Sequence, residues 1–140
     1  MSLPFNVRVY GILIHQGRLL VSDEEYNGIR FTKFPGGGLQ FGEGTVDCLK
    51  REFIEEMGLE IDIRSHFYTV DFFQPSAFNP QQQVISIYYL VHPTESDFSD
   101  PASGENNQHQ VRWIALDAVN DAVFSLPIDK KVAGLIQKIQ

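Results

Sequence analysis

The chain has 140 residues, which suits a single domain over residues 1–140 with a sizeable core and no need for disulfides. Its net charge of −7 argues against duplex nucleic acid or an anionic membrane surface as a partner, because both attract basic surfaces. Cys48 is the only cysteine and no apolar run is long enough to span a bilayer, so we expect a protein of the reducing cytoplasm.

The first part of the chain is rich in β-branched and apolar residues, which favour strands. The predicted strands cover residues 6–14, 18–22 and 31–34. Gln16-Gly17 predicts a tight turn between the first two strands. Residues 23–29 are polar and predict a loop before the third strand, which ends at Pro35.

Residues 45–57 predict an amphipathic helix. Its apolar residues recur every three to four positions, and they are Val46, Leu49, Phe53 and Met57. Thr45 is the expected N-cap, and Gly58 is the expected C-cap glycine. The acidic residues of this helix lie off the apolar stripe, so one side packs and another presents carboxylates.

The second half of the chain predicts three further strands and a C-terminal helix. The strands cover residues 61–73, 84–91 and 111–115, separated by polar loops over residues 74–83 and 94–110. Asp117 opens a short helical turn, and a helix follows Leu126-Pro127. The expected packing face of that helix consists of Val132, Leu135, Ile136 and Ile139. This element order predicts an α/β fold in which helices cover both faces of a mixed β-sheet.

Three carboxylates stand out within the first predicted helix. Glu52, Glu55 and Glu56 have the i, i+3, i+4 spacing that places side chains on one helix face. Such a cluster repels itself unless a cation lies against it, and a hard divalent cation such as Mg²⁺ binds carboxylate oxygens. The spacing therefore predicts a metal site.

These carboxylates belong to a longer pattern. Gly37 is followed, after five residues, by Glu43, and seven residues later residues 51–59 read REFIEEMGL. The segment resembles the Nudix hydrolase signature: Gly, five spacers, Glu, seven spacers, then Arg-Glu-U-x-Glu-Glu-x-Gly-U, where U is a bulky aliphatic residue. Every fixed glycine and charged position is matched, and Phe53 keeps the first U position apolar and bulky. A chance match to so many fixed positions has a probability on the order of one in a billion per window.

The resemblance implies a Nudix-like α/β/α sandwich and a role for each signature residue. It implies that Glu55 and Glu56 are direct metal ligands, and that Glu52 is either a ligand or the base for water. Gly37 resembles the glycine whose carbonyl approaches the metal, and Glu43 resembles an outer carboxylate that supports the site. Arg51 lies four residues before Glu55 and is expected to orient a carboxylate through a bidentate pair.

A further catalytic acid is expected on a distal loop. We choose Glu105, eight residues before Trp113 in the polar loop. The alternative is that Glu105 is an ordinary solvated residue. Gln108 and Gln110 stand near positions where some relatives carry Glu.

Substrate contacts are expected outside the signature. Phe72, Phe73 and Pro75 are the candidates for contacting a base or sugar, although the two phenylalanines equally suit the end of a core strand. Pro75 lies 16 residues past Leu59, an offset that resembles the ADP-ribose branch of the family.

The resemblance implies hydrolysis of a phosphoanhydride in a nucleoside diphosphate linked to another group, such as a sugar nucleotide or an ADP-ribose-like molecule. The implied cofactor is Mg²⁺ or Mn²⁺, the partner is a small-molecule nucleotide, and a homodimer is compatible with it. Two alternatives stay open: a nucleoside-triphosphate pyrophosphatase of the nucleotide-sanitising kind, and a non-catalytic nucleotide-binding module. The complete set of Arg51, Glu52, Glu55 and Glu56 argues against the last alternative.

Overall fold

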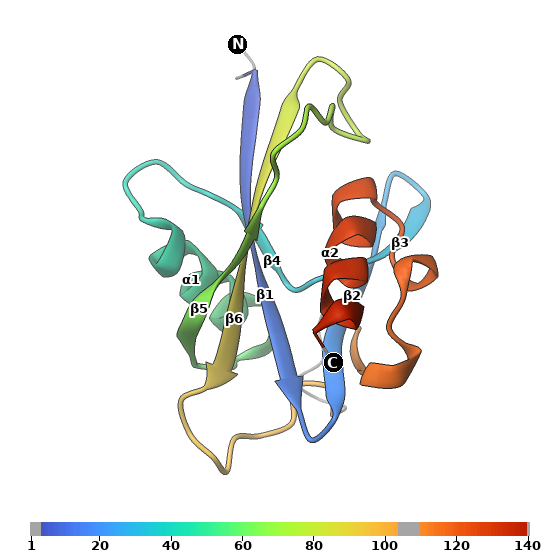
Figure 1. Ribbon diagram of the computed structural model, residues 1–140. Helices are drawn as coiled ribbons and strands as arrows, with labels where there is room; N and C mark the ends of the chain where they lie inside the picture. The colour runs from blue at the N-terminus through green and yellow to red at the C-terminus, as the bar shows by residue number, and fades with distance from the viewer. Residues whose placement is uncertain (1–3, 104–109, 140) are drawn as a thin grey trace.

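The computed structural model describes residues 4–103 and 110–139 (Figure 1). Its strands are β1 (Phe5–His15), β2 (Arg18–Tyr26), β3 (Ile29–Lys33), β4 (Gly36–Gly38), β5 (Ile61–Thr69), β6 (Gln83–Pro93) and β7 (Val111–Ala115). Its helices are α1 (Thr45–Met57), the short turns η2 (Leu116–Ala118) and η3 (Asp121–Val123), and α2 (Pro127–Lys138). Within the described part of the chain, neither longer helix has the length and apolar character needed to cross a bilayer.

The described strands form one mixed sheet. Its main path runs β3-β2-β1-β6-β5, with β4 paired to β1 and β7 paired to β2. The β1–β6 pair is parallel and the other named pairs are antiparallel. β1 and β2 pair only beside their turn, at Ile14–Leu19 and His15–Arg18. Beyond that point β1 pairs with β4 and β2 with β3, so the two central strands separate.

The helices cover opposite faces of the sheet, as Figure 1 shows with α1 and α2 on either side of β1. On one face, Leu49, Phe53 and Met57 of α1 pack in a buried cluster with residues such as Val9 and Leu13. On the other face, the apolar side of α2 packs in a second cluster, which contains Phe34, Tyr88, Phe124, Ile128, Val132 and Ile136. The predicted α/β/α sandwich with a mixed sheet is confirmed.

The prediction of a loop over residues 23–29 is wrong. β2 continues through this polar stretch to Tyr26, and β3 begins at Ile29 after a tight turn. Asp23 shows why, because its carboxylate accepts hydrogen bonds from Thr32 Oγ1 at 2.6 Å and from Arg112 Nε at 2.6 Å. Polar side chains thus find partners on both neighbouring strands, which no local pattern reveals.

The bounds of α1 are confirmed, but its N-cap is not Thr45. Gly44 occupies the cap position, and the Thr45 hydroxyl is hydrogen-bonded to the Tyr89 hydroxyl at 2.7 Å. Gly58 is the C-cap as predicted, with a φ of 65° that favours glycine. Val46, expected to pack against the core, is 37% exposed, whereas Cys48 is buried.

The ends of two later elements also differ from prediction. β5 ends at Thr69 rather than at residue 73, after two register shifts against β6. α2 begins at Pro127, and its buried face therefore includes Ile128, Asp129 and Ala133. The expected packing residue Ile139 lies beyond the helix and is 61% exposed.

Candidate active site

Arg51 is the centre of a charge network on α1. Its Nε and Nη2 donate to the two carboxylate oxygens of Glu43, at 3.0 and 2.7 Å. Its Nη1 donates to Glu52 at 2.9 Å and to Glu55 at 3.1 Å. The bidentate pair expected with Glu55 is therefore made with Glu43 instead, and Glu55 receives a single hydrogen bond.

The Arg51–Glu43 pair fixes the loop that precedes α1. The hydrogen bonds from Arg51 lower the pKa of Glu43 to about 2, and Glu43 in turn raises the pKa of Arg51. Glu43 also accepts from the Gln40 N–H at 2.8 Å, while Arg51 Nη2 donates to the Gly38 carbonyl at 3.2 Å. The loop is thus fastened to the helix at both of its ends.

Gly37 and Glu52 are brought into close contact. A Cβ atom at position 37 would lie 2.5–2.6 Å from the carboxylate atoms of Glu52. The absence of a side chain on Gly37 therefore makes the space in which this carboxylate lies.

The other two carboxylates differ in exposure. Glu56 is 8% exposed, and its Oε2 has no hydrogen-bond partner among the described residues. Burial raises the pKa of Glu56 to about 8, although the nearby Lys33 opposes this shift. The side chain of Glu55, in contrast, is 58% exposed. The acidic face of α1 therefore contains a buried carboxylate, Glu56, and a solvated one, Glu55.

The chemistry of these donors fits a hard divalent cation, which binds carboxylate oxygens. Glu56 has a buried oxygen without a hydrogen-bond partner in the described structure, and the Glu52 carboxylate lies against Gly37. Among the residues that the structure describes, no group of three Asp, Glu, His or Cys side chains is arranged so that it could hold a metal ion. Arg51 holds Glu52 and Glu55 in this arrangement. A bound cation would compete with Arg51 for these two carboxylates.

Of the predicted catalytic and substrate-binding residues that follow α1 in the chain, only Pro75 lines a cavity in the described structure. Glu105 lies outside the described residues. Phe72 lies beside the Lys131 ammonium, and Phe73 is 71% exposed. Neither phenylalanine lines the cavity between β1, β2 and the start of α2, whereas Pro75 does.

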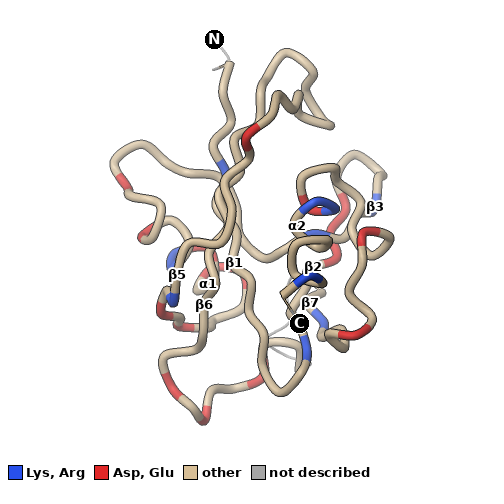
Figure 2. The backbone as a smooth tube through the Cα atoms, viewed as in Figure 1, with Lys and Arg blue, Asp and Glu red and all other residues tan. Residues whose placement is uncertain are grey.

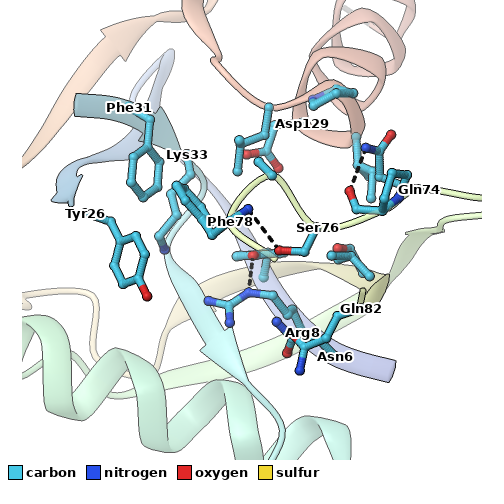
Figure 3. Close-up of a pocket in the computed structure, with 18 of the residues that line it drawn as sticks. Asn6, Arg8, Tyr26, Phe31, Lys33, Gln74, Ser76, Phe78, Gln82 and Asp129 are labelled. Atoms are coloured by element: carbon cyan, nitrogen blue, oxygen red, sulfur yellow. Dashed lines mark hydrogen bonds between the residues drawn. The ribbon is translucent and has the colours of Figure 1, made fainter. Parts of the chain in front are cut away.

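A cavity of about 500 Å³ opens where β1 and β2 separate (Figure 3). Its walls come from these strands, from β3 and β6, from the loop over residues 74–79 and from the start of α2. The rings of Tyr26, Phe31 and Phe78 gather at one side, and Phe78 contacts both of the others. Asp129 lies at another side. A cluster of aromatic side chains faced by polar groups is typical of small-molecule sites.

Asp129 is a buried carboxylate in this cavity, with 2% exposure. Its Oδ1 accepts from the Tyr88 hydroxyl at 2.5 Å, and its Oδ2 has no hydrogen-bond partner among the described residues. Burial raises its pKa to about 6. Sequence reasoning missed this residue, although an Asp between Ile128 and Val132 on the apolar face of a helix was an available signal.

Lys33 connects the cavity to the acidic helix. It is 3% exposed, and its Nζ donates to the carbonyls of Phe34 and Gly36 and to Glu24, at 3.1, 3.2 and 3.0 Å. Burial acts to lower its pKa, but the carboxylate of Glu56, followed by Tyr10 and Glu24, raises it overall. Lys and Arg are scattered among Asp and Glu over the molecule (Figure 2), so positive charge at the cavity comes from individual side chains.

Several solved structures share this fold. The E. coli ORF135 protein is 16% identical with a TM-score of 0.74, and the match covers 98% of this chain and 91% of that one. A MutT NUDIX hydrolase from Burkholderia pseudomallei is 20% identical with a TM-score of 0.71, covering 97% and 98%. An ADP-ribose pyrophosphatase from Streptococcus suis is 18% identical with a TM-score of 0.62, covering 98% and 92%.

A comparison with curated proteins found no match. The family model for the NUDIX domain matches residues 4–133, which is nearly the whole chain and includes both the acidic helix and the cavity. The chain therefore belongs to the Nudix family of hydrolases.

Proposed function

We propose that this protein is a Mg²⁺-dependent hydrolase, also served by Mn²⁺, that cuts a phosphoanhydride in a nucleoside diphosphate linked to another group. A sugar nucleotide or an ADP-ribose-like molecule would be such a substrate. The observation that carries this proposal is the cavity of about 500 Å³, because its lining residues Lys33 and Arg8 lie in the field of the α1 carboxylates Glu56 and Glu52. Lys33 is shared between the cavity and α1, because it pairs with Glu24 in the cavity wall and lies in the field of Glu56.

The cavity supports binding of a nucleoside. The rings of Tyr26, Phe31 and Phe78 offer apolar faces for a base or sugar. The Oδ2 atom of Asp129 is an acceptor without a partner in the described structure, and a base N–H group would satisfy it. Pro75, predicted from the sequence to contact substrate, contributes to the same wall.

The chemistry would take place at α1. Glu52, Glu55 and Glu56 would hold the metal, with the backbone carbonyl of Gly37 nearby. When bound, a divalent cation neutralises phosphate oxygens and activates water for attack. Arg51 would keep Glu52 and Glu55 oriented until the cation arrives, and Glu52 acts as a ligand or as the base. Glu105 stays our candidate for a further acid.

A nucleoside-triphosphate pyrophosphatase is the second candidate. The exposed side chain of Glu55 favours this candidate. If the terminal phosphates of a triphosphate lie near Glu55, that end of the substrate faces solvent. Pyrophosphate is a product that needs no pocket of its own. MutT and ADP-ribose pyrophosphatase are both named among the similar structures, which is compatible with either candidate.

The experiment is a hydrolysis screen in Mg²⁺ with ADP-ribose, sugar nucleotides, dinucleoside polyphosphates and the nucleoside triphosphates, with products identified by ³¹P NMR. A nucleoside monophosphate with a phosphorylated second product supports the first candidate. A monophosphate with pyrophosphate supports the second. Turnover that survives exhaustive EDTA treatment would contradict the metal mechanism, and nucleotide binding without any turnover would favour a binding module.

A further inference from the structure

We infer that Arg8 binds the substrate phosphate nearest the nucleoside and so connects the cavity with the acidic face of α1. The identity of the ligand as a nucleotide rests on the proposed function. The assignment of Arg8 itself rests on its position, its available donors and the saturation of the neighbouring lysine.

Arg8 stands at the boundary between the two halves of the site. It lies on β1, opposite Gly38 of β4 on one side and Ser86 of β6 on the other. Its side chain lines the cavity (Figure 3). Its Nη1 lies 3.6 Å from the position that a Cβ on Gly38 would take, so the guanidinium lies against β4.

The Arg8 guanidinium uses one of its N–H donors in a hydrogen bond within the described structure, and its other donors are available. Nε donates to the Tyr10 hydroxyl at 2.7 Å. Among the described residues, no hydrogen bond uses Nη1 or Nη2. Burial acts to lower the pKa of Arg8, but Tyr10, followed by the carboxylates of Glu52 and Glu24, raises it overall, and neither carboxylate pairs with Arg8. Two parallel N–H groups match the geometry of a phosphate.

Lys33, the other cation of the cavity, lacks this capacity. An ammonium group has three donors, and those of Lys33 are used by Phe34, Gly36 and Glu24. Arg8 is therefore the cation in the described cavity wall that is ready to accept an anion without losing an existing contact. Lys33 instead holds the start of β4, the strand against which Arg8 lies.

A series of contacts fixes the direction from Arg8 to Asp129. The Tyr10 ring lies 5.2 Å from the Tyr88 ring, centroid to centroid, and the Tyr88 hydroxyl donates to Asp129. Tyr10 and Tyr88 are both buried, and close packing restricts the movement of the two rings. A nucleotide whose base reaches Asp129 would direct its phosphate toward Arg8 and the carboxylates beyond.

The test compares binding of monophosphates with binding of the matching nucleosides, by calorimetry without metal. The probes are AMP, GMP, CMP and UMP and their four nucleosides. We expect the wild-type protein to bind at least one monophosphate about tenfold or more tightly than its nucleoside, because hydrogen bonds to charged groups contribute at this level. In Arg8→Gln this preference should disappear while nucleoside affinity stays the same.

Arg64→Gln is the matched control, because Arg64 is an exposed arginine of β5 that does not line the cavity. It makes the same change in charge and should retain the preference. Arg8→Lys should retain part of it, and Tyr10→Phe should weaken it by releasing Nε. Melting curves of all variants establish that they fold.

A preference that persists in Arg8→Gln, or a wild-type protein that binds no monophosphate better than its nucleoside, would overturn the assignment. Failure of the proposed function gives a different result. In that case the Arg8-dependent preference is present but no substrate of the hydrolysis screen is cut.

Discussion

At the scale of single residues, burial and neighbours give identical side chains different properties. Glu43 and Glu56 are both glutamates of the signature segment. Hydrogen bonds from Arg51 hold the pKa of Glu43 at about 2, whereas burial raises that of Glu56 to about 8. Glu43 is thus suited to a permanent ion pair, and Glu56 is a carboxylate that only a cation would fully stabilise as an anion.

Glu56→Gln should reduce metal-dependent turnover by more than about a hundredfold, because loss of a ligand costs more than loss of a group that orients one. The fold should be retained, since a neutral amide avoids the cost of burying a charge. Initial rates in Mg²⁺ and far-ultraviolet circular dichroism measure the two effects. Glu60→Gln, at an exposed glutamate just beyond α1, is the control. A fully active Glu56→Gln enzyme would refute the site.

Asp129 predicts a pH dependence of stability. Its pKa of about 6 in the folded state exceeds the ordinary value of 3.8, so the folded protein retains a proton that the unfolded chain loses between these values. Its contribution to the free energy of unfolding is present below pH 3.8 and declines as pH rises to about 6. The total change is on the order of 3 kcal/mol.

In Asp129→Asn that decline should be absent, while the acceptor for Tyr88 remains. The variant should therefore gain stability relative to the wild type as pH rises from 4 toward 6, and the difference should level off above this range. Urea unfolding at each pH measures it. Asp117→Asn, at an exposed aspartate, is the control. A difference that is constant with pH would contradict the assignment.

At the scale of elements, α1 depends on the strand and loop that precede it. β4 brings Gly37 against Glu52, and Arg51 fastens the following loop through Glu43 and Gly38. The helix ends at Met57, and the left-handed conformation of its C-cap Gly58 turns the chain toward β5. The carboxylates are therefore positioned by contacts on both sides of the helix, not by helical spacing alone.

Gly37→Ala should lower turnover by about tenfold or more with little change in melting temperature. The new methyl group would displace the Glu52 carboxylate, and the end of a flexible side chain can move at small cost. Parallel measurements of turnover and thermal unfolding separate the two effects. Gly134→Ala on α2 is the control, because a Cβ there meets nothing within 4 Å. Equal activity of Gly37→Ala and wild type would show that the close contact is unimportant.

At the scale of the whole molecule, the divergence of β1 and β2 joins two sites that lie on different faces of the sheet. The strands pair only beside their turn, and the cavity lies between their separated ends. Lys33 and Arg8 lie in this gap, where each lies in the field of a carboxylate of α1. A continuous sheet would have isolated the acidic helix from the cavity beside α2.

Mg²⁺ should raise the melting temperature of the whole protein, because a ligand that binds only the folded state stabilises it. The expected gain is about 2.7 kcal/mol at a metal concentration one hundred times the dissociation constant. Differential scanning calorimetry with and without Mg²⁺ measures it, and EDTA should reverse it. Glu56→Gln should show a much smaller shift, and an equal shift in that variant would place the metal elsewhere.

Much of this architecture was predictable because it depends on local pattern. The bounds of α1 follow from apolar spacing and from Gly58, and β7 follows from the apolar run around Trp113. The polar end of β2 was missed, since its stability comes from Thr32 and Arg112 on other strands. The early end of β5 was missed for a related reason, because register shifts depend on the partner strand.

The sequence by itself determined the family, the fold class and the set of acidic residues on α1, because a motif of fixed spacing on one helix needs no long-range information. Only the tertiary structure decided that Arg51 forms its bidentate pair with Glu43 and that Asp129, Lys33 and Arg8 surround one cavity. Those residues lie far apart in the chain, and their proximity depends on strand order and register. Side chains that meet across a sheet carry no signature in local spacing, which is why the acidic residues of α1 were predictable from the sequence and the residues of the cavity were not.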